Sequence, residues 1–364
     1  MKKLGNLNGN FEYELLDENQ QDSYLRQKLA NLYSTPFTDI LWWELKKSSL
    51  KENGCYKLYY YEQTGLKHII LFQHYVKAPQ KIVVVNKEFK ISSKHIENIA
   101  SILFNEFDRV QQIIFEKIFE HDFQRLPKMI FEKTWHNDVI IPLPKFMDDY
   151  MKSLGSSTHK KIKLMTNRIA KDFPDFKVRF FEKNEILFEH IDRVLSLNNE
   201  RMKIKGIDSN THLESKLYQY TSTSGYGLLC LCEINGKMAG TTFGFIFGEH
   251  AYLYKIAHDN AYNKYSLGQI ALIHTTKYLI EEKKIKHYHL LGGAQEYKYH
   301  HGGVNFFLYT VKVFRNNDVY YFFGKKIAPL VTKYWEFRRR LKKNKTIFNF
   351  YNKLYFLKMK LKSV

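Results

Sequence analysis

The second half of the chain shows the clearer pattern of hydrophobic and polar positions. Apolar residues at helical spacing predict helices over 184–206, 213–222 and 269–283. Between and after them, half-buried runs predict strands, and Asn235-Gly236 predicts a hairpin turn. The expected strands span 227–234, 238–248, 251–258, 286–291, 305–314 and 319–324.

The first half repeats this order in a weaker form. A turn at Thr64-Gly65 joins two predicted strands, and a Ser stands at the expected N-cap of the helix over 92–107. The predicted strands of this half span 55–62, 67–76, 81–85, 111–119, 127–135 and 138–144. The similar succession of elements predicts two similar α/β units in one chain.

These patterns divide the chain into four parts. We expect a first unit over 1–150, a basic connector helix within 151–183, a second unit over 184–324, and a tail over 325–364. In the connector, a Ser-Ser-Thr run supplies candidate N-caps, and Pro174 ends the helix.

The charge is concentrated in the tail. The whole chain carries +20, and residues 325–364 hold 13 Lys and Arg against one acid, a net of +12. Such a segment favours phosphate groups, either of RNA or of an anionic membrane surface. With 44% hydrophobic and 16% aromatic residues, the rest of the chain has enough apolar material for a folded core.

The three cysteines do not form a spaced framework. Cys230 and Cys232 stand in a strand-like run, where we expect small buried hydrophobic residues, and Cys55 begins another predicted strand. The N-terminus shows no signal-peptide pattern, and no apolar run is long enough to span a bilayer. The expectation is a soluble, cytoplasmic protein that touches the inner membrane face at most.

The stretch AYNKYSLGQIAL, residues 261–272, places a polar elbow directly before a helix. Backbone amides at a helix start lack partners, and the helix dipole adds positive potential, so an elbow of this kind suits an anion. The backbone needs to be bare where the anion approaches, and Gly268 meets that need.

The order of strands, elbow, helix and strand resembles the GNAT acyltransferases. The elbow motif of that family, Gln/Arg-x-x-Gly-x-Gly/Ala, falls on residues 263–268, where only the last Gly matches. The later run HLLGGAQEYKYHHGG makes the pattern more similar to the CelD-type acetyltransferases of polysaccharide synthesis. The matching positions are Asp259, Tyr262, Ser266, Gly268, Tyr297 and Lys298, with Leu267 in place of a Pro. The doubled architecture extends the resemblance to FemAB-type aminoacyltransferases.

The resemblance implies a fold, a co-substrate and a site. The fold is α/β, with tandem GNAT-like units, each a mixed, mostly antiparallel sheet flanked by helices. Acyl-CoA is the expected co-substrate, and no permanently bound cofactor is expected. Its pantetheine lies between two parting strands and its pyrophosphate on the elbow. The residues expected to bind it are Ile256, Ala257, Asn263, Lys264, Ser266, Leu267, Gly268 and Gln269.

Acyl transfer needs a donor for the oxyanion and a group that removes a proton. By the resemblance, Lys298 is the expected oxyanion donor, beside Tyr297. Glu296, Asp259 and His258 are open candidates for the base, with His289 as a further one. A metal site built on the histidines is not expected, because they lack a metal-binding motif.

Three functions follow. The first is acyl transfer from acyl-CoA to an amino sugar or another saccharide precursor of the cell envelope. The second is a FemAB-type transfer from aminoacyl-tRNA to a peptidoglycan precursor. The third is a non-catalytic protein that binds RNA or a membrane through 325–364.

Overall fold

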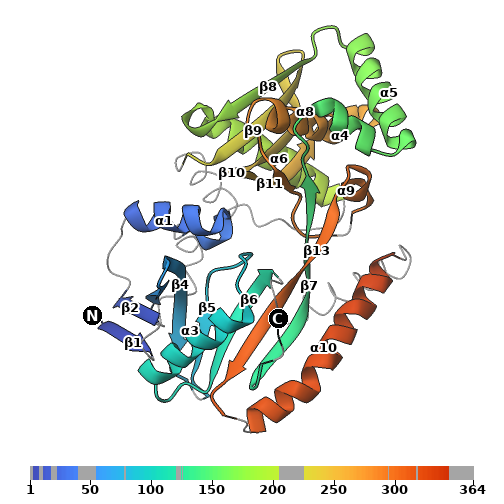
Figure 1. Cartoon of the computed structure of the whole chain (residues 1–364). Coiled ribbons are helices and arrows are strands. Elements are labelled where there is room, and N and C mark those ends of the chain that lie inside the picture. Colours follow the sequence, from blue (N-terminus) through green and yellow to red (C-terminus); the bar gives the residue numbers. More distant parts are fainter. Residues whose placement is uncertain are drawn as a thin grey trace, which may run out of the picture. The chain divides into compact units, whose positions relative to one another are not determined.

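The computed structural model describes residues 3–7, 11–17, 23–39, 55–77, 79–119, 124, 126–204, 225–293, 295–316 and 319–343 (Figure 1). The chain forms two compact units. The first contains residues 1–17, 53–136 and 307–364, and the second contains 18–52 and 137–306.

The first unit is a sheet with helices. Its strands follow the order β1-β2-β3-β4-β5-β6-β13. The bounds are β1 Lys3–Leu7, β2 Phe11–Asp17, β3 Cys55–Glu62, β4 Gly65–Tyr75, β5 Lys81–Val84, α3 Ser93–Glu106, β6 Gln112–Phe119, β13 Val304–Phe314 and α10 Val319–Lys343. The Ser92 hydroxyl accepts a hydrogen bond from the His95 amide, which confirms the expected N-cap of α3.

The second unit has the strand order β7-β12-β11-β10-β9-β8, and β7 enters it at residue 137. Its elements are α1 Ser23–Tyr33, η1 Pro36–Thr38, β7 Met129–Pro142, α4 Met147–Ser153, α5 Ser156–Asp172, β8 Lys177–Glu182, η3 Lys183–Glu185, α6 Phe188–Ile204, β9 Gly227–Ile234, β10 Lys237–Phe247, β11 His250–His258, η4 Asn260–Tyr265, α8 Leu267–Glu281, β12 His287–His289 and α9 Glu296–His300.

The strands of the two units pair in the same order. In the first, β3, β4 and β5 are antiparallel neighbours, and α3 leads to β6, which lies parallel to β5. In the second, β9, β10 and β11 are antiparallel neighbours, and α8 leads to β12, parallel to β11. A parallel neighbour requires a crossover, and in both units a helix provides it. The expected fold class is therefore confirmed.

Strand β9 shows why the second unit has a core on both faces of its sheet. Leu228, Cys230 and Cys232 belong to one buried cluster, with α8, while Leu229 and Leu231 belong to another, with α6. Alternate residues of a strand point to opposite faces, so a strand apolar at every position is buried on both. Cys230 and Cys232 are free and buried, as expected. The side chain of Cys55 lies outside the described ones.

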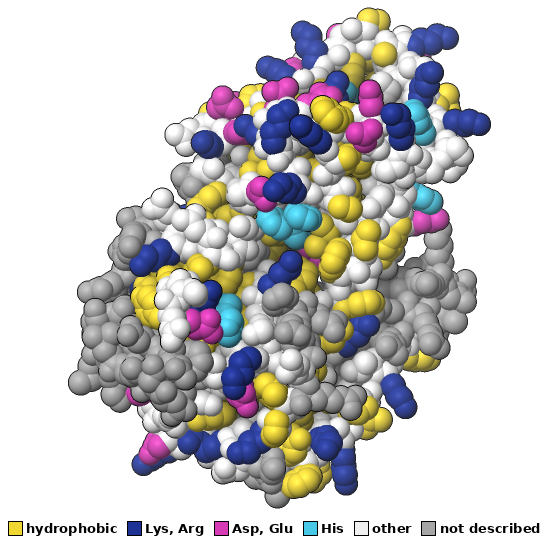
Figure 2. Space-filling model, in the orientation of Figure 1, with side chains coloured by type: hydrophobic (Ala, Val, Ile, Leu, Met, Phe, Trp, Pro, Cys, Tyr) yellow, Lys and Arg dark blue, Asp and Glu magenta, His cyan; other side chains and the backbone are white. Residues whose placement is uncertain are grey.

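Helix α5 is amphipathic in the way its sequence predicts. Ile162, Met165 and Ile169 are buried, and its Lys and Arg side chains are exposed. Figure 2 shows such dark-blue side chains projecting where α5 lies in Figure 1. The helix begins one residue after Gly155, so the expected Ser-Ser-Thr caps lie inside its first turn.

Several expectations differ from the structure. Residues 319–324 were expected as a strand, but they begin α10, which runs on through 325 without a break. The two strands expected over 127–144 are one strand, β7. The borders of the units also differ from the expected ones. The second unit takes in residues 137–150 and the connector, and the first unit takes in 307–324. The helix expected over 213–222 lies outside the described residues.

Candidate functional site

The elbow before α8 turns the chain sharply between β11 and the helix. Asp259 caps the short helix η4 by accepting a hydrogen bond from the Ala261 amide at 2.9 Å. Ser266 then turns the chain with φ 55° and ψ 43°, the left-handed conformation that glycine adopts most readily. This is the position that the GNAT motif gives to its first Gly. A Ser therefore makes the same turn, at some cost in backbone strain.

The first amides of α8 are available to a ligand. Gln269 and Ile270 both donate to the Ser266 carbonyl, at 2.8 and 3.2 Å. For Leu267 and Gly268, the structure shows no backbone acceptor among the described residues. Ser266 makes no side-chain cap on them either. Two such N–H groups at the positive end of a helix can bind an anion.

Next to the elbow, strands β11 and β12 separate. They pair in parallel only from His250 to Tyr252, opposite 287–289. Beyond that point Leu290 donates its amide to the Val139 carbonyl of β7, while β11 continues to His258. Among the described residues, no strand therefore pairs with the last part of β11 on that side.

The strand register shows which amides face this opening. Asp259 donates to the Ala239 carbonyl at 2.8 Å, and the pairs Thr241–Ala257 and Thr242–Ile256 precede it. Hydrogen-bonded and non-bonded pairs alternate in an antiparallel ladder. The backbone amides of Ile256 and His258 therefore point away from β10, into the opening, whereas that of Ala257 points toward β10.

A pocket of about 350 Å³ occupies the opening. It joins the parted strand, the elbow and the segment before α9. Its lining residues are Arg201, Ile256, His258, Asn263, Ser266, Gly268, Gln269, Gln295 and Tyr297. Five of the eight residues expected to bind a co-substrate line this pocket. A sixth, Leu267, lies between two lining residues, and its amide has no backbone acceptor among the described residues.

Gly268 leaves the pocket open. A Cβ atom added there would lie 3.2 Å from Ile256 Cγ1 and 3.4 Å from His258 Nδ1. On the neighbouring strand β10, a Cβ added to Gly240 would lie 2.8 Å from Leu267 Cβ. Glycine at both positions lets the start of α8 lie directly on β10 and β11.

Arg201 is a pocket residue that the sequence reasoning missed. It reaches from α6 and donates from Nη1 to the Ile256 carbonyl at 2.6 Å. Its Nε is buried and has no hydrogen-bond acceptor among the described residues. Burial lowers the pKa of Arg201. The only signal in the sequence was a basic residue within an amphipathic helix, which is a common feature of surface helices.

Two further side chains give the pocket acid–base groups. His258 Nε2 lies 2.9 Å from the Asn263 Oδ1 atom. Burial raises the pKa of Tyr297, while nearby Arg201 lowers it. Tyr297 therefore keeps its proton at neutral pH and can donate it.

The other expected site residues lie elsewhere. Ala257 is buried in the core cluster with α6. Asp259 pairs with Arg193 at 3.2 Å and caps η4. Lys264 is exposed, with its ammonium over the Tyr265 ring. Glu296 is exposed beside His300 and lines a neighbouring pocket of about 310 Å³, which shares Gln269 and Tyr297 with the first.

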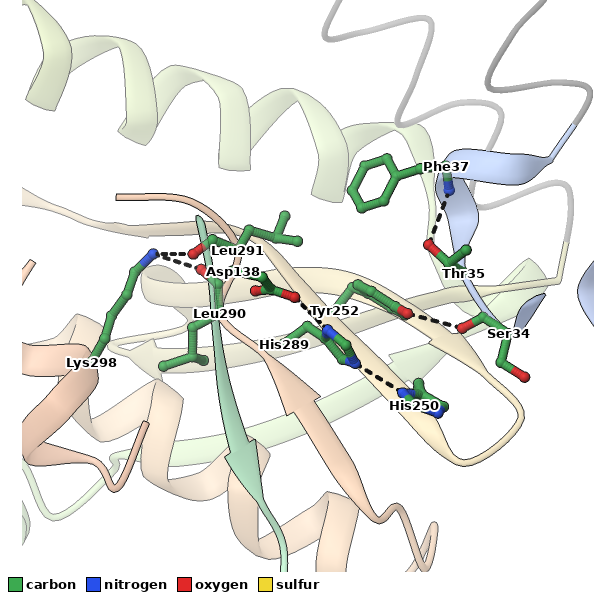
Figure 3. Close-up of polar contacts among 10 residues, drawn as sticks. All are labelled: Ser34, Thr35, Phe37, Asp138, His250, Tyr252, His289, Leu290, Leu291 and Lys298. Carbon is green, nitrogen blue, oxygen red and sulfur yellow. Dashed lines mark hydrogen bonds and ion pairs between the residues drawn. The ribbon is translucent and has the colours of Figure 1, made fainter. Parts of the chain in front are cut away.

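Lys298 is not in the pocket lining. Its side chain is buried, and its Nζ donates to the carbonyls of Leu290 and Leu291 at 2.7 and 2.9 Å (Figure 3). It also donates to the Gly292 carbonyl at 2.8 Å. Burial lowers the pKa of Lys298 to about 8, so the ammonium still predominates at pH 7. The three N–H groups of the Lys298 ammonium hold the turn after β12 together, and none of them is left for an oxyanion.

His289 is part of a buried chain of polar groups. Its Nδ1 lies 2.5 Å from Asp138 Oδ2, and its Nε2 lies 2.8 Å from His250 Nδ1 (Figure 3). A carboxylate can only accept in such a contact, so His289 donates from Nδ1. The chain links β7, β12 and β11 away from the pocket lining, which argues against His289 as the base.

Comparison with known proteins fits this geometry. Residues 156–299 match the family model described as "Acetyltransferase (GNAT) domain". The chain carries a GNAT domain. The matched segment contains the elbow, the two parted strands and every residue that lines the pocket. No curated protein matches the chain.

Solved structures extend the likeness beyond the GNAT domain. FemX has 11% identity and a TM-score of 0.60, over 85% of this chain and 99% of FemX. L-PGS from Bacillus licheniformis has 11% identity and a TM-score of 0.45, over 76% of this chain and 89% of its own. A tandem GNAT protein from the clavulanic acid biosynthesis pathway has 8% identity and a TM-score of 0.41, over 84% of this chain and 100% of that protein. At these identities the FemX likeness shows the fold alone.

Proposed function

We propose that the chain transfers an acyl group from acyl-CoA to an amino sugar or another saccharide precursor of the cell envelope. The observation that carries the proposal is the pocket at the parted strands. It combines the unpaired Leu267 and Gly268 amides with the outward amides of Ile256 and His258.

Each part of the pocket has a task under this proposal. The two elbow amides bind the pyrophosphate of the co-substrate. The pantetheine amides pair with the edge of β11 that faces the pocket, as a strand would. The thioester carbonyl then lies near the His258 amide, which stabilises the oxyanion of the tetrahedral intermediate.

The proton steps fall to two lining residues. His258 is the candidate base for the attacking amine or hydroxyl, because its ring lines the pocket beside the strand edge. Tyr297 remains protonated and can return a proton to the CoA thiolate as it leaves. Arg201 adds a cation that orients an anionic part of a substrate.

The experiment is a coupled thiol assay. Acetyl-CoA is incubated with the full chain and a series of amino sugars, and the released CoA thiol is measured. The proposal expects acceptor-dependent thiol release that His258→Ala and Tyr297→Phe reduce. Release that no acceptor stimulates, or that neither variant changes, would refute it.

A second candidate is transfer from aminoacyl-tRNA to a peptidoglycan precursor. The likeness to FemX over most of both chains favours it. Labelled amino acid moving from charged tRNA to a precursor, with no thiol release from acetyl-CoA, would select this alternative. Either activity is proposed for the cytoplasm, where both donors are made.

A further inference from the structure

Helix α10 has two apolar faces, and only one is covered. Tyr321 and Ala328 pack against Ile130 of β7 and Phe314 of β13. The contact is close, because a Cβ on Gly324 would lie 2.9 Å from Ile130 Cδ1. Figure 1 shows α10 running alongside these strands. This inner face attaches the helix to the first unit.

The other face is an apolar stripe in solvent. The stripe consists of Phe323, Ile327, Leu330, Tyr334 and Phe337, which are 61%, 48%, 63%, 49% and 58% exposed. Their spacing of four, three, four and three residues keeps them within an arc of about 80° at 3.6 residues per turn. Scattered exposed apolar residues are ordinary, but five in one line on one helix mark an interaction surface.

The charge beside the stripe is strongly positive. The sequence of α10 contains eight Lys and Arg and one acid, Glu336, so its net charge is +7 (8 − 1). Lys326 and Lys333 are exposed, and by helical geometry they lie about 60° to 80° from the middle of the stripe. An apolar face bordered by basic side chains is the pattern of a helix that lies in a membrane interface.

We propose that the stripe of α10 binds the surface of an anionic lipid bilayer. The apolar side chains enter the boundary between headgroups and acyl chains, and the Lys side chains reach lipid phosphates. The proposal is independent of the acyl-transfer proposal, since it concerns a different unit and no pocket residue.

Charge and side-chain type favour a bilayer over other occupants. A second copy of the chain would set one helix of +7 against another, with a single acid on each to compensate. RNA would match the charge, but it has no apolar surface to cover the aliphatic Ile327 and Leu330 at the centre of the stripe. An anionic bilayer complements both the charge and the apolar side chains.

The test is co-sedimentation of the full chain with vesicles of phosphatidylcholine, with and without phosphatidylglycerol. The double variant Ile327→Ser/Leu330→Ser removes the middle of the stripe and leaves the charge unchanged. Leu164→Ser is the matched control, since Leu164 is 58% exposed on the basic helix α5. Circular dichroism confirms that both variants remain folded.

We expect the wild type and Leu164→Ser to bind phosphatidylglycerol vesicles in a salt-sensitive way. The double variant should bind at least about tenfold more weakly, because two aliphatic side chains no longer leave water. Equal binding by all three proteins would overturn the proposal. So would a concentration-dependent dimer of the wild type, lost in the double variant, without vesicle binding.

Discussion

Gly268 carries the most specific role of any single residue in the pocket. Its Cβ-free backbone faces Ile256 and His258, and the neighbouring amides form the proposed anion site. The sequence identified this position from its place between a strand and a helix. It did not predict the left-handed backbone conformation of Ser266. Ser rarely adopts that conformation, and no sequence pattern indicates it.

Gly268→Val should weaken CoA binding by more than tenfold, which corresponds to a loss of more than about 1.4 kcal/mol in binding free energy. The branched side chain would occupy the space where backbone and pyrophosphate meet. Gly268→Ala is the graded comparison, because its Cβ meets the flexible Ile256 side chain at 3.2 Å and should cost less. Isothermal titration with CoA measures both; an unchanged affinity of folded Gly268→Val would contradict the role.

Lys298 gives the clearest difference between sequence and structure at this scale. By the resemblance, the Tyr-Lys pair implied that Lys298 donates to the oxyanion. The side chain instead satisfies three backbone carbonyls in a buried turn. Sequence could not show this, since the three acceptors depend on how residues 290–292 fold.

Lys298→Met should therefore lower the free energy of unfolding by about 1 to 3 kcal/mol, the cost of leaving buried acceptors unsatisfied. Chemical denaturation of wild type and variant measures the change. If the variant keeps its stability but loses turnover, the catalytic role expected from the resemblance would stand instead.

At the scale of elements, the hairpin, the elbow and helix α8 were predictable because each has a local signal. Strands β9 to β11 and helix α8 lie within a few residues of their predicted bounds. Helix α10 was not predicted at its start. Its first residues are aromatic and β-branched, which favours a strand locally, and packing on Ile130 and Phe314 selects the helix.

The contact between β10 and the start of α8 gives a prediction for two elements together. Gly240→Ala would place a Cβ 2.8 Å from Leu267 Cβ and push the helix start from the sheet. Both the melting temperature and CoA affinity should fall. Gly155→Ala is the control, since nothing lies within 4 Å of its added Cβ. A Gly240→Ala protein with normal affinity would show that the elbow tolerates this shift.

At the scale of the molecule, the sequence predicted two related units but not how the chain is divided between them. Strand β7 takes the chain into the second unit, and β13 returns it to the first. Residues 23–39 join the second unit, where the Tyr252 hydroxyl donates to the Ser34 carbonyl at 2.9 Å (Figure 3). Such pairings join residues about two hundred positions apart, and a single sequence has no local pattern for them.

The described helices include none that is long and apolar enough to cross a membrane.

Stability of the first unit should depend on pH through His68. Burial is the main cause that lowers the pKa of His68 from its ordinary value of 6.5 to about 3. Below pH 6.5 the unfolded chain takes up a proton that the folded chain does not, so stability is complete above pH 6.5 and is lost toward pH 3. At pH 5 this group alone should cost about 2 kcal/mol.

The measurement is denaturation of wild type and His68→Gln at pH 7.5 and pH 5. The variant should lose less stability between the two values than the wild type does, because its amide does not titrate. Equal losses in both proteins would mean that His68 does not control this part of the pH dependence.

The central claim is that the pocket between β11 and the segment after β12 binds acyl-CoA. Isothermal titration of acetyl-CoA into the full wild-type chain tests it most directly, with Gly268→Val titrated in parallel. The account predicts saturable binding at one site per chain, lost or weakened by more than tenfold in the variant. Absence of binding to a folded wild type, or equal binding by the variant, would contradict it.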